Sequence, residues 1–234
     1  MHRARETLRP GQEERGIEMI RTAILLASCL LAACAPASDN GDGDGATLTA
    51  EITTSLGVIS LELYPDAAPV SVANFVEHAQ AGHYDGGSFY RAVRPDNDRP
   101  GIEPMHLIQG GYGFDGLPEA DGIAHEPTEQ TGLSHVRGAI SMARFDPGTA
   151  TTEFFIMVDD YPGLDSGPGR RNPDEAGYAV FGQVIAGMEV VEAIAEQETS
   201  LEEAPEDFQY PQFIVEPVRI ESVRVVDANA RGQQ

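Results

Sequence analysis

One arginine and one glutamine stand among aromatic and aliphatic residues in the segment from Ser88 to Gly111, which reads SFYRAVRPDNDRPGIEPMHLIQGG. Arg91 follows an aromatic pair, and Gln109 follows a short apolar run. The Pro- and Asp-rich stretch between them is typical of a loop, so it separates two strand-like pieces. A charged donor and an amide in apolar surroundings suit a mostly apolar ligand that carries one polar atom.

The elements that must position these side chains are short strands and two helices. Alternating apolar residues predict a hairpin of strands over 48–54 and 58–64. Apolar residues at helical spacing predict amphipathic helices over 69–82 and from Met188 to Ala195. Further strands are expected over 138–143, 153–158, 178–184 and 214–226, the last as one strand or two. Without an internal repeat, this order predicts a mainly β domain, either a closed barrel capped by helices or a sandwich.

Four sequence blocks occur in the order found in one known family. They are Phe89-Tyr90-Arg91, Ile108-Gln109-Gly110-Gly111, residues 138–143 (GAISMA) with Glu153-Phe154-Phe155, and Val180-Phe181-Gly182. Together they resemble the cyclophilin-type peptidyl-prolyl isomerases over roughly residues 48–227. The resemblance implies a closed eight-stranded antiparallel β-barrel capped by two α-helices, with a peptide groove on its outer face.

The reaction that this resemblance implies is rotation about the peptide bond that precedes proline. The barrier to that rotation is about 18–20 kcal/mol. No bond is made or broken, so we expect no cofactor and no metal. As the bond twists, the proline nitrogen regains a lone pair, and Arg91 matches the family's position for a donor to that nitrogen. The alternative for Arg91 is a surface salt bridge in a very acidic protein.

The resemblance also assigns a substrate groove. Gln109 is expected to hold the substrate backbone, and Ala143 and Arg144 to line the part of the groove that takes the residue before proline. The residues expected to bind substrate are His106, Leu107, Gln109, Ala143, Arg144, Glu153, Phe155, Leu164 and Tyr178. For the apolar members of this set, simple core packing is the alternative.

Three of these residues depart from the family's usual choice. His106 stands where phenylalanine is usual, Glu153 replaces a glutamine, and Tyr178 replaces a histidine. We expect Glu153 to bring negative charge beside the groove and to pair with Arg91 or Arg144. Insertions over 96–104 and 167–176 are expected to enlarge loops near the groove and to influence partner choice.

The charge of the chain is strongly negative. Of its 234 residues, 38 are acidic and 15 are arginines, and there is no lysine. Five arginines and four glutamates precede Cys34, which leaves a net charge of −24 after it. Such a chain repels phosphate groups, so a nucleic-acid role is excluded. The expected partners are proline-containing polypeptides, and the resemblance implies a monomer.

The N-terminal segment is predicted to be a signal peptide over 1–33, with Met19 as a possible true start. Its end, Leu31-Ala32-Ala33-Cys34, resembles the lipobox of bacterial lipoproteins, which implies lipidation at Cys34. The alternatives are an ordinary signal peptide or a single membrane anchor. We expect a flexible tether over 34–47, a folded domain over 48–227 and a tail over 228–234.

The expected place of action is therefore the periplasm, through a lipid anchor in the outer membrane of a Gram-negative bacterium. Both cysteines, Cys29 and Cys34, lie in or next to the signal peptide, so thiol chemistry is excluded from the domain. The predicted function is isomerisation of X-Pro bonds in exported proteins. The alternatives are a catalytically weak proline-peptide-binding or chaperone module and a barrel that serves only as an envelope scaffold.

Overall fold

The computed structural model describes residues 48–114, 116–118, 120–206 and 208–227. The predicted signal peptide with its alternative start at Met19, the lipidation residue Cys34, the tether over 34–47 and the tail over 228–234 lie outside the described residues. Within the described ranges, no helix is both long enough and apolar enough to cross a membrane.

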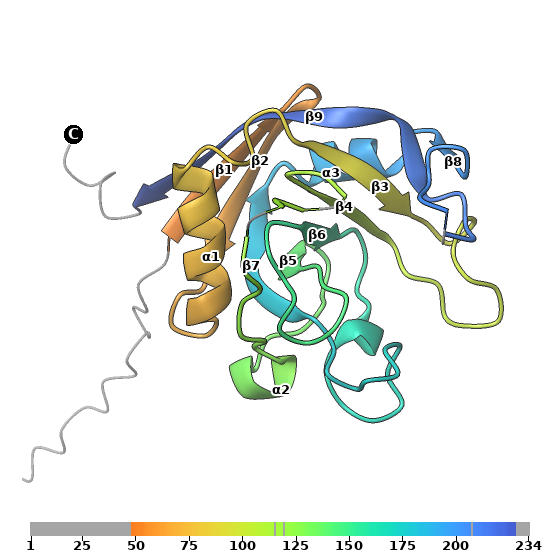
Figure 1. Ribbon diagram of the computed structural model, residues 1–234, viewed down its shortest axis with the longest axis horizontal. Coiled ribbons are helices and arrows are strands. Elements are labelled where there is room, and N and C mark those ends of the chain that lie inside the picture. Colours follow the sequence, from red (N-terminus) through yellow and green to blue (C-terminus); the bar gives the residue numbers. More distant parts are fainter. Residues whose placement is uncertain (1–47, 115, 119, 207, 228–234) are drawn as a thin grey trace, which may run out of the picture. The chain divides into compact units, whose positions relative to one another are not determined.

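Eight antiparallel strands form a closed barrel (Figure 1). In sheet order they are β1 (Leu48–Thr54), β2 (Gly57–Leu63), β7 (Ala179–Ala186), β5 (Ala139–Met142), β6 (Phe154–Met157), β4 (Leu107–Gly111), β3 (Ser88–Val93) and β9 (Phe213–Asp227). Strand β9 also pairs with β1, which closes the barrel. A two-residue strand, β8 (Thr199–Ser200), adds to the start of β9. The structure confirms the predicted barrel over the sandwich.

The hairpin between β1 and β2 shows how the sequence sets the register. Thr54 Oγ1 donates a hydrogen bond to the Gly57 carbonyl at 2.8 Å and accepts one from the Leu56 amide at 3.1 Å. Gly57 has φ +144°, which a residue with a side chain rarely adopts. The turn aligns Ile52 with Ile59, so the buried faces of both strands point into the barrel.

Helices α1 (Pro69–Gln80) and α3 (Met188–Ala195) lie where the sequence predicts them, α1 against β7 and β9 and α3 against β2, β3 and β4. The residue before α1, Ala68, offers no side-chain cap. The buried carboxylate of Glu126 fills that role, because it accepts hydrogen bonds from the Val70 and Ser71 amides. Two short helices, α2 (Thr128–Thr131) and the 3-10 helix η1 (Pro162–Leu164), lie between strands where the sequence predicted no helix.

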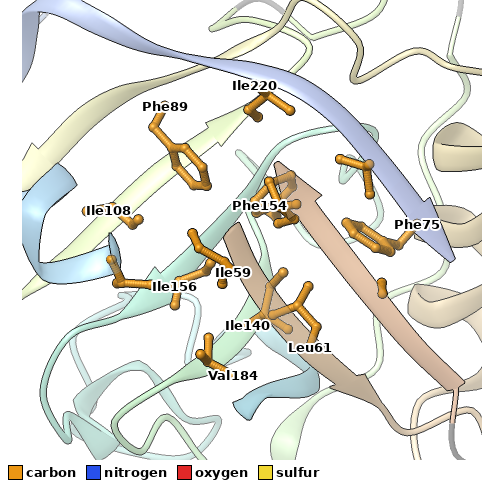
Figure 2. Packing of buried hydrophobic residues seen from close by; sticks show 14 of the residues in the cluster. Ile59, Leu61, Phe75, Phe89, Ile108, Ile140, Phe154, Ile156, Val184 and Ile220 are labelled. Atoms are coloured by element: carbon orange, nitrogen blue, oxygen red, sulfur yellow. The ribbon is translucent and has the colours of Figure 1, made fainter. Parts of the chain in front are cut away.

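The barrel interior is filled by aromatic and branched aliphatic side chains (Figure 2). Phe75 of α1 reaches into it, and its ring centroid lies 5.7 Å from that of Phe154 and 5.4 Å from that of Phe181. Phe154 also meets the edge of Phe89 at 5.8 Å. Each ring is fully buried. Burying such side chains supplies the main driving force for folding.

The outer face of β4, β5 and β6 is buried as well. All four residues of β5 and of β6 are buried, so neither strand has a solvated face. A second apolar cluster lies on this outer face, separate from the barrel interior. It includes Leu107 of β4, Phe155 of β6 and Leu164 of η1. The chain between β6 and β7 thus covers an apolar surface outside the barrel, and the candidate site lies there.

Candidate active site

Strands β3, β4 and β6 place three predicted site residues in one row. Arg91 pairs with Gln109 across β3 and β4, and Gln109 pairs with Phe155 across β4 and β6. Directly opposed residues of neighbouring antiparallel strands lie side by side on the same face. The register therefore brings together residues that are far apart in the sequence.

A β-bulge in β3 turns two consecutive side chains to the outer face. The pairing of β3 with both β4 and β9 shifts register between Phe89 and Arg91. Phe89 and Ala92 belong to the barrel core, whereas Tyr90 and Arg91 bond to Gln109 outside it. A regular strand would alternate and send one of the two inward. The bulge thus supplies the site with an arginine and a tyrosine together.

The Arg91 guanidinium is held by two amide oxygens. Its Nη1 donates to Gln109 Oε1 at 2.7 Å, and its Nη2 and Nε donate to Gln212 Oε1 at 2.6 and 3.1 Å. Among the described residues no carboxylate forms an ion pair with Arg91. Burial lowers the pKa of Arg91, but an arginine stays protonated at neutral pH. The surface salt-bridge alternative for Arg91 is therefore wrong.

A chain of hydrogen bonds orients Gln109 toward Arg91. Glu153 Oε2 accepts from the Tyr90 hydroxyl at 2.8 Å, and that hydroxyl accepts from Gln109 Nε2 at 2.9 Å. With its amide nitrogen bound to Tyr90, Gln109 presents its oxygen to Arg91. The expectation that Glu153 pairs with Arg91 or Arg144 is wrong, because its other partners are the Gly113 amide and the Thr152 hydroxyl.

The carboxyl group of Glu153 is itself buried. Its residue is 7% exposed, and this burial raises the pKa of Glu153, although hydrogen bonds from the Gly113 amide and Tyr90 partly offset the effect. Burial and the nearby Glu153 charge also raise the pKa of Tyr90 well above its usual value. Tyr90 therefore stays a neutral hydroxyl that donates to Glu153 while it accepts from Gln109.

An apolar pocket of about 210 Å³ opens beside Arg91, and we call it the outer pocket. Its apolar wall is formed by Met105, Leu107, Phe155 and Leu164. The predicted residues Gln109, Ala143, Arg144, Glu153 and Tyr178 also line it. The structure therefore brings together all predicted substrate-binding residues except one.

The exception is His106, which does not line the outer pocket. Its Nδ1 lies 2.8 Å from a carboxylate oxygen of Asp159. Successive side chains point to opposite sides of an extended segment, so Met105 and Leu107 face the pocket and His106 turns away. The prediction that His106 lines the substrate pocket is therefore wrong, and this part of the wall is apolar.

Arg144 and Tyr178 form one side of the outer pocket. The Arg144 guanidinium lies 5.1 Å from the centroid of the Tyr178 ring and donates to Asp174 Oδ2 at 2.7 Å and to the Gly177 carbonyl. Hydrogen bonds from Arg144 hold the pKa of Asp174 below its usual value. Arg144 lines the pocket, and its charge is thus neutralised by a residue of the 167–176 insertion.

Besides Met105, three residues close to Arg91 were not anticipated from the sequence. Phe114 and Phe208 line the outer pocket, and the Arg91 guanidinium lies 5.6 Å from the Phe208 ring centroid. Gln212, which accepts two hydrogen bonds from Arg91, is almost fully buried just before β9. Phe114 and Phe208 also meet edge to face at 5.3 Å. None of the three belongs to a motif.

Behind Phe155 lies a buried polar group centred on His135. The imidazole stacks on Phe155 at 5.7 Å, and its two nitrogens contact Asp165 at 2.6 Å and the Ser141 hydroxyl at 3.1 Å. Burial lowers the pKa of His135 despite the opposing effect of Asp165. Both His135 and Ser141 have no exposed surface, so this group supports the pocket floor and cannot meet substrate.

Comparison with known proteins agrees with this architecture. Residues 49–225 match the family described as "Cyclophilin type peptidyl-prolyl cis-trans isomerase/CLD". A peptidyl-prolyl cis-trans isomerase of Acinetobacter baylyi is 35% identical over 211 residues, which cover 89% of this chain and 97% of the relative. Peptidyl-prolyl cis-trans isomerase A of Dickeya dadantii is 36% identical and covers 75% of this chain and 83% of its own.

A solved structure has the same fold. The cyclophilin type peptidyl-prolyl cis-trans isomerase of Cryptosporidium parvum aligns with a TM-score of 0.57 at 20% identity, covering 77% of this chain and 98% of that one. The chain thus belongs to the cyclophilin-type peptidyl-prolyl cis-trans isomerases. Its activity is the cis-trans isomerisation of peptide bonds that precede proline.

Proposed function

We propose that the outer pocket is the isomerase site, that Arg91 stabilises the twisted peptide bond in it, and that the substrates are exported polypeptides. The observation that carries the catalytic part is the placement of an unpaired guanidinium at the rim of an apolar pocket. Arg91 lines the pocket together with Leu107, Phe155 and Leu164. Arg144 also lines the pocket but is paired with Asp174, so Arg91 is the charged donor without an ion-pair partner among the described residues that can face the proline nitrogen.

The chemistry requires only that the twisted state be bound more tightly than either planar state. Twisting removes amide resonance, so the proline nitrogen gains a lone pair that it lacks in the ground state. A guanidinium has five N–H groups. Arg91 uses three of them on Gln109 and Gln212, which leaves one on each terminal nitrogen. A hydrogen bond from one of these to the proline nitrogen forms only as the bond twists.

The neighbouring groups hold the substrate in register. Gln109 and Arg144 lie on the pocket wall, where they can bond to the substrate backbone, and Ala143 leaves room for the residue before proline. The proline ring is placed against Phe155, Leu107 and Leu164, and Tyr178 borders it. Met105 takes the position on the wall that the sequence had suggested for His106.

The experiment compares the purified protein with Arg91→Ala and Arg91→Lys in an exchange measurement on a proline peptide by nuclear magnetic resonance. We expect kcat/KM to fall by about tenfold to a hundredfold in Arg91→Ala, since a hydrogen bond from a charged donor contributes about 1.5–3 kcal/mol. Arg91→Lys should recover little of the lost kcat/KM, because a lysine cannot bond to the amide oxygens of Gln109 and Gln212 while it also faces the substrate. Full activity in Arg91→Ala would refute this role.

The export part of the proposal is supported by the sequence before the domain. Leu31-Ala32-Ala33-Cys34 has the form of a lipobox, and a stretch of Gly, Asp and Ser follows it. We propose that lipidated Cys34 anchors the enzyme in the periplasm, at the outer membrane, where it acts on proteins that have crossed the inner membrane. Mature protein that carries lipid on Cys34 should be released from membranes by detergent and not by salt. Cys34→Ser should remain unprocessed, and salt-soluble native protein would refute the anchor.

A further inference from the structure

A second pocket of about 390 Å³ adjoins the outer pocket, and we call it the loop pocket. The two share a wall that includes Arg91, Leu164 and Phe208. The loop pocket is completed by residues of the 96–104 and 167–176 loops, including Arg99 and Asn172. The loop pocket is therefore continuous with the proposed site of isomerisation, and the two insertions form part of its wall.

A buried ion pair joins the two loops that form this pocket. Arg171 Nη2 donates to both carboxylate oxygens of Asp98, at 2.6 and 2.9 Å, and the two side chains are 4% and 2% exposed. The same carboxylate accepts from the amides of Arg99 and Met105. Burial alone would raise the pKa of Asp98, but these hydrogen bonds outweigh it and lower that pKa. The loops are thus fixed against each other by a carboxylate that stays ionised.

The charge of the loop pocket is opposite to that of the chain. Its described lining contains three arginines, Arg91, Arg99 and Arg171, and one aspartate, Asp98. Because Asp98 is committed to Arg171, the charges of Arg91 and Arg99 are left without an ion-pair partner among the described residues. In a protein with 38 acidic residues against 15 arginines, a net positive pocket suits an acidic ligand.

The position of the pocket indicates which part of a substrate it meets. Ala143 and Arg144, where the residue before proline is placed, line the outer pocket but not the loop pocket. A peptide whose proline ring lies against Leu164 therefore continues past Phe208 into the loop pocket with the residues that follow proline. This orientation rests on the proposed function.

We propose that the loop pocket binds the residues that follow proline and selects an acidic side chain there, chiefly through Arg99. Arg99 is exposed, lines the pocket and forms no ion pair among the described residues, so an incoming Asp or Glu can pair with it. Asn172 and Gln209 add amide groups that can bond to the peptide backbone. Lysine or arginine after proline is disfavoured by repulsion.

The test uses peptides that differ only in the residue after proline, which is Glu, Ala or Lys. The purified protein is compared with Arg99→Gln and with Arg170→Gln, a matched control because Arg170 is an exposed arginine of the neighbouring loop that lines neither pocket. Exchange spectroscopy gives kcat/KM for each peptide. We expect Glu to exceed Lys by about fivefold, the effect of one partly shielded ion pair. This ratio should approach unity in Arg99→Gln and stay unchanged in Arg170→Gln.

Two results would overturn the proposal: an equal kcat/KM for the Glu and Lys peptides, or a preference for Glu that falls equally in both variants. The second result would assign the preference to overall charge. If no peptide exchanges faster with the protein present, the isomerase site itself is refuted. In that case the dissociation constants of the same peptides, measured by titration from chemical-shift changes, still test the loop pocket. Equal dissociation constants for the Glu and Lys peptides would refute the proposed preference for an acidic residue.

Discussion

Replacing Tyr90 with phenylalanine removes one oxygen atom from the hydrogen-bond chain that runs from Glu153 to Arg91. Two bonds are lost, Tyr90 to Glu153 at 2.8 Å and Gln109 to Tyr90 at 2.9 Å. The bond from Tyr90 to the buried Glu153 carboxylate contributes about 1.5–3 kcal/mol to stability, because its acceptor is charged. The bond from Gln109 to Tyr90 contributes about 1 kcal/mol. We expect the free energy of unfolding to fall by about 2.5–4 kcal/mol, or the melting temperature by about 5–15 °C.

The same substitution should slow isomerisation. Without the Tyr90 hydroxyl, the Gln109 amide can turn its nitrogen toward Arg91, where it would repel the guanidinium. Gln212 still holds Arg91 through two bonds, so orientation is lost only in part. We expect kcat/KM to decrease by about tenfold, which corresponds to about 1.4 kcal/mol and is less than the loss in Arg91→Ala.

The assay pairs urea unfolding with peptide exchange, and Tyr84→Phe is the matched control. Tyr84 is fully buried, and its hydroxyl has no hydrogen-bond partner among the described residues. Its loss should leave kcat/KM unchanged and stability equal or higher. The double variant Tyr90→Phe/Glu153→Gln should lose less stability than the two single variants together, because it leaves no buried carboxylate without a hydrogen-bond donor. A Tyr90→Phe enzyme with normal kcat/KM would refute the orienting role of this chain.

Three further substitutions test other parts of the structure. Glu126→Ala removes the cap of α1 and should lower the free energy of unfolding by about 2 kcal/mol in urea; no change would mean that packing alone starts the helix. Asp98→Asn leaves Arg171 buried without a counter-charge and should lower the free energy of unfolding by about 3 kcal/mol. Amide hydrogen exchange should become faster in the 96–104 and 167–176 loops; unchanged rates would show that the ion pair does not hold the two loops together. Burial raises the folded-state pKa of Glu153 above its ordinary value of 4.5, so the folded state binds the proton more tightly and stability falls as pH rises above about 4.5. The native protein should therefore lose stability relative to Glu153→Gln as the pH rises from about 4.5 to 7; a constant difference would contradict the raised pKa.

Most of the barrel could be predicted because its determinants are local. Alternation placed Ile59, Leu61 and Leu63 on one face of β2, and all three are fully buried. Helical spacing similarly placed Val72 and Phe75 toward the core. Closure could not be predicted in this way, because it depends on pairing between β1 and β9, which alternation within each strand does not specify. The family resemblance supplied the choice between barrel and sandwich.

The site was predictable where a motif carried it and not elsewhere. Arg91 and Gln109 lie in recognisable blocks, and the register confirms that they are neighbours. Gln212 lies far along the chain in a loop of ordinary composition, so nothing local indicates that it binds Arg91. The partners of Glu153 depend on a bulge that turns Tyr90 outward, and a bulge of one residue leaves little trace in the pattern. His106 was predicted to face the pocket from its place in the sequence, but side chains alternate along this extended segment, so Met105 and Leu107 face the pocket and His106 does not.

The long strand β9 joins the beginning of the domain to its end. Thr49 pairs with Val226, and the same strand pairs with β3 near its other end. β1 thus pairs with a strand that is made after all the other strands of the barrel, so the barrel cannot close before β9 has been synthesised. Contacts this distant in sequence make folding slow, and until β9 arrives β1 offers an open edge to other chains. An enzyme that speeds the isomerisation of peptide bonds before proline therefore has a late, non-local step in its own folding.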